Sequence, residues 1–231
     1  MSTLIASHSA VEEDVIESMP ETLADLVHRL GDIPLERIRM RPAPGTAVEQ
    51  DVIPLKMCEL IDGVVVEKAM SFFESRLAMV LVMFLETYSI KSKLGFVVGP
   101  DAQIRMSTGR IRIPDVSFLR WDGASNKRVP TDPIGPFAPD LAVEILSPGN
   151  TKQEMIEKRR DYFTAGTRLV WIVDAKKKSV SVYRTIDDCR VIQEDGSVEG
   201  EEVLPGFALS IKEWFETATG ERDGETTSQN E

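Results

Sequence analysis

The sequence predicts a mixed α/β domain in which helices flank a sheet that contains one parallel crossover. Two runs, LAVEILS at 141–147 and LVWIVD at 169–174, are apolar on both faces and are typical of central strands. Between them, Thr151 and Glu154 match a capping box, and Gly166 is well placed to end a helix. A strand, a helix and a second buried strand in this order predict parallel strands joined by a crossover.

The other elements follow from local patterns. Asp62-Gly63 lies between two short strand-like runs in KMCELIDGVVVEKAM, which is a hairpin signal. Apolar side chains recur at helical spacing over 70–88. We also expect a helix at 21–30, strands at 96–105, 111–120 and 179–184, a Pro-rich loop at 121–139 and a final helix containing IKEWFET.

Length and composition indicate one globular domain in a reducing compartment. The chain has 231 residues, which we divide into a disordered acidic N-terminus (1–20), a domain (21–217) and a disordered acidic tail (218–231). No apolar run approaches the roughly 20 residues that span a bilayer, and the N-terminus lacks the pattern of a secretory signal. Two cysteines far apart argue against a disulfide framework, so we expect a cytoplasmic protein without a membrane partner.

The ionisable residues favour a hard cation over zinc. Two His and two Cys are too few for an ordinary zinc site, whereas plentiful carboxylates suit Mg²⁺ or Mn²⁺. The net charge of −11 argues against a protein that coats nucleic acid, but the acidic excess is concentrated at the chain ends and does not exclude a nuclease. Basic clusters at 110–112, 127–128 and 158–160 form either a local basic surface or ordinary solvated charge.

Two carboxylates, Asp115 and Glu144, interrupt otherwise apolar strand patterns. A carboxylate in such a position is costly unless it meets a cation, a basic side chain or several donors. Two carboxylates on neighbouring strands also repel each other, and a divalent cation between them would relieve both costs. The competing interpretation places each acid at a strand end facing water, and it is weaker for Glu144, whose neighbours in the strand are apolar.

A nuclease also needs a positive group near the scissile phosphate. Lys158 lies two turns into the helix after the Glu144 strand, where it shares a face with Glu154 and Asp161. Spacing alone favours a solvated polar face with an i,i+4 ion pair. Glu74, near the start of the long helix, either accepts a hydrogen bond from a metal-bound water or is simply exposed.

Several motifs together resemble the Uma-two family, restriction-endonuclease-like proteins of the PD-(D/E)XK nuclease superfamily. They are PDVSF at 114–118, APDLAVEILSPGNT at 138–151, KRRDYFTAG at 158–166 and LVWIVD at 169–174, and the resemblance extends from about Leu26 to Phe215. It implies a restriction-endonuclease-like mixed sheet flanked by helices, and a Mg²⁺-dependent endonuclease that hydrolyses DNA.

The resemblance also implies roles for single residues. Asp115 would be the acid of the PD motif and Glu144 the second acid; both would ligate Mg²⁺, together with the backbone carbonyl of Ile145. The acid of the first helix would be Glu74. The superfamily's lysine, expected two residues after Glu144, is replaced by Leu146, and the resemblance implies that Lys158 takes its place.

Three functions stay open on the sequence. The first is DNA hydrolysis by a catalytic set of Asp115, Glu144, Lys158 and Glu74 with Mg²⁺ or Mn²⁺. The second is an inactive interaction module on the same fold, in which Glu144 forms a structural ion pair with Lys158 or an arginine. The third is a metallohydrolase that acts on a small phosphoester. Enzymes of this fold are often homodimers because DNA has two strands, and the sequence leaves a homodimer open.

Overall fold

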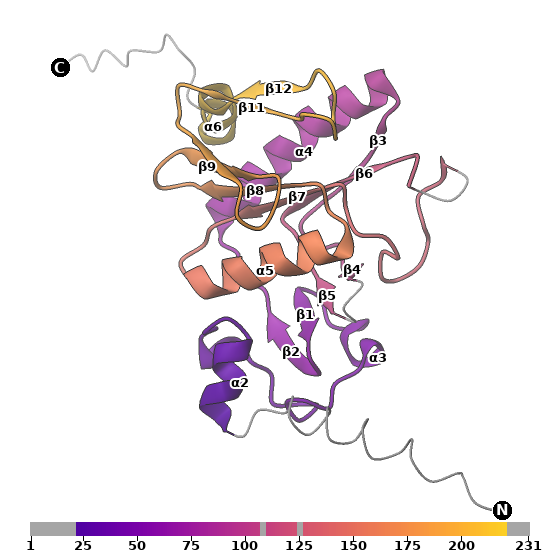
Figure 1. The fold of residues 1–231 in the computed structure, drawn as a ribbon, viewed down its shortest axis with the longest axis vertical. Helices are drawn as coiled ribbons and strands as arrows, with labels where there is room; N and C mark the ends of the chain where they lie inside the picture. The colour runs from indigo at the N-terminus through magenta and orange to yellow at the C-terminus, as the bar shows by residue number, and fades with distance from the viewer. Residues whose placement is uncertain (1–21, 107–109, 124–126, 221–231) are drawn as a thin grey trace, which may run out of the picture.

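A computed structural model describes residues 22–106, 110–123 and 127–220 (Figure 1). The predicted disordered N-terminus, 1–20, and most of the predicted tail lie outside these residues. The last helix, α6 (Ile211–Thr219), continues past 217. The first two residues that we assigned to the tail are therefore helical.

A six-stranded mixed sheet forms the centre of the molecule, with strand order β10-β9-β8-β7-β6-β3. Its strands are β3 (Gly95–Val98), β6 (Val116–Arg120), β7 (Leu141–Ile145), β8 (Leu169–Asp174), β9 (Ser179–Tyr183) and β10 (Cys189–Ile192). β7 and β8 are parallel, and α5 (Lys152–Ala165) connects them. The predicted crossover is confirmed, including the Thr151–Glu154 capping box and the left-handed Gly166 at φ +102°.

Helices cover the two faces of this sheet. α4 (Phe72–Ser92) and α6 pack on the face that presents Val116, Val143 and Ile145. α5 packs on the opposite face, where Met155 and Tyr162 contact Ala142 and Val170. Because successive residues of a strand alternate between faces, Glu144 points toward α5 with Ala142. A carboxylate is thereby placed between a sheet and a helix.

A four-stranded sheet of order β2-β1-β5-β4 lies on the other side of α5 (Figure 1). It contains the predicted hairpin, β1 (Cys58–Ile61) and β2 (Val64–Glu67), followed by β4 (Ile104–Arg105) and β5 (Ile111–Arg112). The hairpin turn needs Gly63 because φ is +76° and a Cβ would lie 2.6 Å from the backbone of Gly45.

The strand predicted at 111–120 is two strands in two different sheets. Pro114 has no backbone N–H to donate, and the N–H of Ile113 bonds to the Glu59 carboxylate at 3.0 Å instead of to a strand. The chain leaves the small sheet here and joins the main sheet at Val116. The strand predicted at 96–105 divides in the same way into β3 and β4. Asp115 therefore lies at the junction of the two sheets.

The remaining elements are short. They are α2 (Leu23–Arg29), η1 (Leu35–Arg37), α3 (Glu49–Val52), β11 (Ser197–Glu199) and β12 (Ala208–Ser210). Both cysteines are free, Cys58 buried and Cys189 exposed. Within the described ranges, no helix has the length and apolar character needed to cross a bilayer.

Candidate metal centre

Asp115 and Glu144 lie side by side where β6 begins. Val116 pairs with Val143, so the antiparallel register places Asp115 opposite Glu144. The backbone fixes Asp115 at both ends: its N–H donates to the carbonyl of Val143 at 2.9 Å, and its Oδ2 accepts the N–H of Ile145 at 2.6 Å. Both acids are buried, with exposures of 2% and 4%. The sequence interpretation that placed them at strand ends facing water is wrong.

Glu144 has two partners on α5. The Lys158 ammonium donates to both of its oxygens at 3.1 Å, and the Tyr162 hydroxyl donates to Oε1. Lys158 and Tyr162 lie four residues apart, so one helical face presents both donors to the carboxylate. The expectation from spacing alone, that Lys158 sits on a solvated polar face, is wrong, because the lysine is only 2% exposed.

Glu59 is a third buried acid that our sequence reasoning missed. It lies in β1, has no exposed surface, and contacts the Lys158 ammonium at 3.1 Å. Its other oxygen accepts a hydrogen bond from Arg112 at 2.9 Å. The signal was present in CELI, where a carboxylate again interrupts an apolar strand. The rule that selected Glu144 would also have selected Glu59.

The pKa values of this cluster follow from burial and shared cations. Burial raises the pKa of Glu144 despite the nearby Lys158. Burial acts in the same sense on Glu59, but Lys158 and Arg112 together outweigh it and lower the pKa of Glu59 to about 2. Burial and the Glu144 carboxylate raise the pKa of the Tyr162 hydroxyl, so it stays a donor. Glu144 is thus the less stabilised anion of the two.

Asp115 has a cation of its own, Lys68, which our sequence reasoning also missed. The Lys68 ammonium lies 2.7 Å from Asp115 Oδ1, and both side chains are almost fully buried. The same ammonium donates to the carbonyl of Pro100 at 3.2 Å. Lys68 follows β2 directly, and no local pattern marks it as different from a surface lysine.

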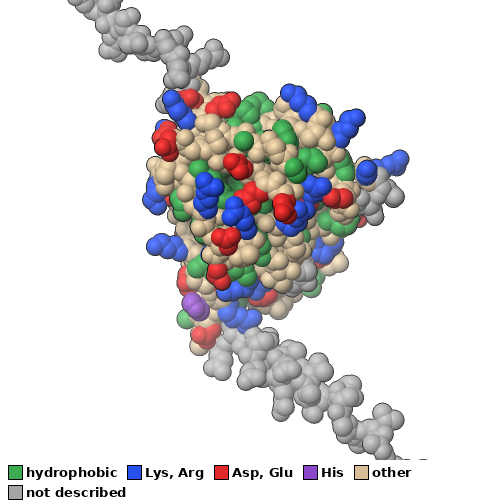
Figure 2. Space-filling model, turned by 45° about the horizontal axis from the view of Figure 1, so that its top comes forward, with side chains coloured by type: hydrophobic (Ala, Val, Ile, Leu, Met, Phe, Trp, Pro, Cys, Tyr) green, Lys and Arg blue, Asp and Glu red, His purple; other side chains and the backbone are tan. Residues whose placement is uncertain are grey.

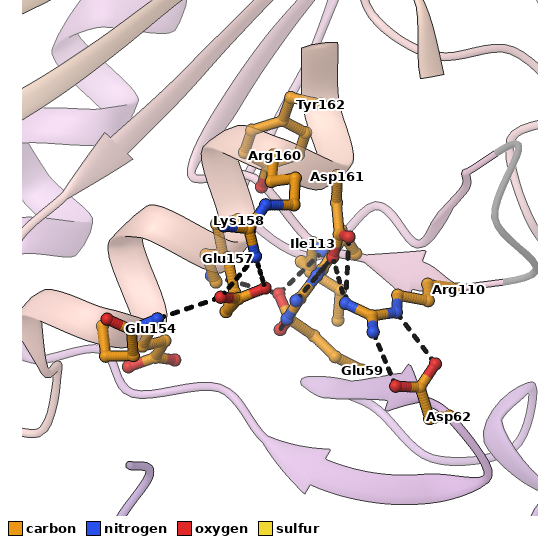
Figure 3. A network of polar contacts seen from close by, with 12 residues as sticks. Glu59, Asp62, Arg110, Ile113, Glu154, Glu157, Lys158, Arg160, Asp161 and Tyr162 are labelled. Carbon is orange, nitrogen blue, oxygen red and sulfur yellow. Dashed lines mark hydrogen bonds and ion pairs between the residues drawn. The ribbon is translucent and has the colours of Figure 1, made fainter. Parts of the chain in front are cut away.

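The acidic and basic side chains continue as one network along α5 (Figure 3). Arg112 and Arg110 both bind Asp161, at 2.6 Å and 3.0 Å, and Arg110 also holds Asp62 in the hairpin turn. At the other end, Arg37 binds Glu154 at 2.7 Å. Each buried carboxylate of this network therefore has a basic partner; the pairs are Asp115–Lys68, Glu144–Lys158, Glu59–Arg112, Asp161–Arg110 and Glu154–Arg37.

This pairing corrects the interpretation of Arg112 and Lys158 as surface charge. Arg112 and Lys158 are buried within ion pairs and contribute no basic surface. On the face shown in Figure 2, acidic and basic side chains are interspersed rather than separated into patches.

Glu74 makes no hydrogen bond with the acid pair in the described part of the chain. It lies in the first turn of α4, which covers the sheet face opposite to that of Glu144. The side chain is buried rather than exposed, and among the described residues its Oε2 has no hydrogen-bond partner. The charged groups that govern the pKa of Glu144 are Lys158, Asp115, Lys68 and Glu59. Of the expected catalytic set, the structure brings Asp115, Glu144 and Lys158 together.

The donor set fits a hard divalent cation. Mg²⁺ is usually held by one or two carboxylates plus water and substrate oxygens, so Asp115 and Glu144 suffice. Asp115 Oδ1 is a buried oxygen without a hydrogen-bond donor in the described part of the chain, although Lys68 lies against it. Those residues include no cluster of three or more His, Cys, Asp or Glu arranged to hold a metal.

Comparisons with known proteins agree with this architecture. A solved structure described as a putative nuclease belonging to DUF820, from Anabaena variabilis ATCC 29413, superimposes with a TM-score of 0.61. It is 21% identical, and the match covers 86% of this chain and 99% of that one, which shows a shared fold. No curated protein matches the chain. The Uma2 (Uma-two) family, described as "Putative restriction endonuclease", matches residues 50–212, so the chain belongs to that family.

Proposed function

We propose that the protein is a phosphodiesterase that hydrolyses DNA with Mg²⁺ or Mn²⁺ held by Asp115 and Glu144. The observation that carries the proposal is the pair itself: two buried carboxylates face each other at the junction of two sheets. Family membership and the shared nuclease fold support the same activity. A bound divalent cation would polarise the scissile phosphate and lower the pKa of a bound water.

In this proposal, the residues around the acid pair have different roles. The N–H of Ile145 orients Asp115 through Oδ2, which leaves Oδ1 as the oxygen without a hydrogen bond among the described residues. Lys158 and Tyr162 hold Glu144 in a single orientation. We assign Lys158 a positioning role, because its contacts to Glu144 and Glu59 hold it inside the cluster. The carbonyl of Ile145 remains our proposed third protein ligand.

Cleavage of single-stranded, double-stranded and branched DNA by the full-length protein would test this. Glu144→Gln and Asp115→Asn keep side-chain shape and remove one charge each, so we expect metal-dependent cutting to fall about a hundredfold or more. Asp122→Asn is the matched control, since that carboxylate is 65% exposed and forms an ion pair with Arg120 alone among the described residues. Cutting that persists in Glu144→Gln would show that the site is elsewhere.

A second function has its own support. Each carboxylate of the network is already paired with a basic group of the chain, as in the structural ion-pair core of an inactive interaction module. In that case no divalent ion would support cutting of any of the three DNA forms. Cutting that requires Mg²⁺ and is lost in Glu144→Gln would eliminate this alternative.

A further inference from the structure

Lys68 and Lys158 are held in the cluster in different ways. The Lys158 ammonium contacts both oxygens of Glu144 and one oxygen of Glu59, each at 3.1 Å. Lys68 touches one carboxylate oxygen and one backbone carbonyl. Two carboxylates thus share Lys158, whereas Asp115 is the one carboxylate among the described residues that Lys68 contacts.

The Lys68–Asp115 contact is short, but its angles are not those of a hydrogen bond. The two atoms lie 2.7 Å apart, yet Asp115 Oδ1 is a buried oxygen without a hydrogen bond among the described residues. The contact therefore has the distance of an ion pair without the geometry of a hydrogen bond, and geometry supplies much of the strength of such pairs. Oδ2, in contrast, is fixed by Ile145.

The charge of the cluster restricts what can be added to it. Its buried carboxylates already have one basic partner each. A divalent cation beside Asp115 would introduce uncompensated positive charge in a region of low dielectric, within a few ångströms of Lys68. The repulsion is relieved if one ammonium leaves.

We propose that Lys68 is the exchangeable cation of this centre, so that a divalent ion and the Lys68 ammonium compete for Asp115 Oδ1. The proposal rests on the metal site of the proposed function and adds its regulation. To bind, the ion must displace the Lys68 ammonium from its contact with Asp115. Lys158, anchored by two carboxylates, stays in place. Lys68 is accordingly a residue that tunes metal affinity through Asp115.

Mn²⁺ binding to the full-length protein without DNA tests the competition, with free Mn²⁺ measured by electron paramagnetic resonance. Lys68→Met removes the competing charge and keeps the length of the side chain, so we expect the affinity for Mn²⁺ to rise at least about tenfold. Lys68→Arg keeps the charge and is expected to lack this gain. Lys177→Met, at a lysine that is 78% exposed, is the matched control and should bind as the wild type does.

A measurement on the wild-type protein tests the exchange even if Lys68→Met fails to fold. Lysine ammonium resonances are recorded by ¹⁵N NMR with and without Mg²⁺. The proposal predicts that Mg²⁺ shifts or removes the Lys68 signal and leaves the Lys158 signal in place.

These experiments distinguish a failure of the lysine exchange from a failure of the metal site. If the wild type binds Mn²⁺ through Asp115 and Glu144, but Lys68→Met binds equally or more weakly, the exchange is refuted and the metal site stands. Mg²⁺ binding that moves neither lysine signal also refutes the exchange. Absence of Mn²⁺ binding in the wild type and in Lys68→Met overturns the metal site and this inference together.

Discussion

Replacement of Lys158 by methionine removes the cation that Glu144 and Glu59 share. Methionine is close to lysine in length, so the main change is one lost charge among buried carboxylates. Loss of one partner from a buried ion pair typically costs about 3–5 kcal/mol, because the remaining charge is left without compensation. We expect Lys158→Met to destabilise the protein strongly at pH 7.

The pKa of Glu59 also indicates how much stability is lost when Lys158 is replaced. The pKa of Glu59 is lowered from 4.5 to about 2, and each pKa unit corresponds to about 1.4 kcal/mol. The charged form of Glu59 is therefore favoured in the fold by about 3 kcal/mol, of which Lys158 supplies the largest favourable part. We therefore expect a loss of about 3 kcal/mol, at the lower end of the range for buried ion pairs, which lowers the melting temperature of a domain of this size by about 10 °C.

Urea unfolding followed by circular dichroism at pH 7 measures this loss. Lys177→Met is the control, since that lysine is exposed and its pair with Asp174 should contribute under about 1 kcal/mol. A Lys158→Met protein as stable as the control would refute the conclusion that these ion pairs hold α5 against the small sheet.

Further predictions concern the same region. Glu59 contributes stability above pH 4.5 that is lost as the pH falls toward 2, so wild-type unfolding free energy should drop across this range while Glu59→Gln shows a flatter profile. Tyr162→Phe removes a donor to buried Glu144 and should cost about 1–3 kcal/mol by urea unfolding; an unchanged midpoint would contradict the contact. Gly31→Ala should destabilise by at least about 1 kcal/mol in thermal unfolding, because φ is +92° and its Cβ would lie 2.6 Å from Glu154 Cα; an unchanged melting temperature would refute this packing.

Sequence reasoning predicted the elements whose signals are local. The crossover of β7, α5 and β8 and the Asp62-Gly63 hairpin were predictable because apolar periodicity, caps and turn residues are encoded in neighbouring positions. The split of 111–120 between two sheets was not predicted. Pro114 was the available signal, since a residue without an N–H donor interrupts strand pairing.

The site was predictable in part for a similar reason. Asp115 and Glu144 stood out because each carboxylate breaks an apolar strand pattern. Lys68 was not predictable, since its partner is distant in the sequence and only the tertiary fold brings them together. The face of α5 that contains Lys158 looked solvated on spacing alone. Helical periodicity does not reveal that a second sheet, which contains Glu59 and Arg112, covers that face.

The proposed function requires that Asp115 and Glu144 together bind a divalent cation. Anomalous diffraction from a crystal of the full-length protein soaked in Mn²⁺ tests it most directly. We predict one Mn²⁺ peak within coordination distance of Asp115 Oδ1 and a Glu144 oxygen, and its loss in a Glu144→Gln crystal. A soaked crystal without density between the two carboxylates, or with Mn²⁺ bound only elsewhere, would contradict it.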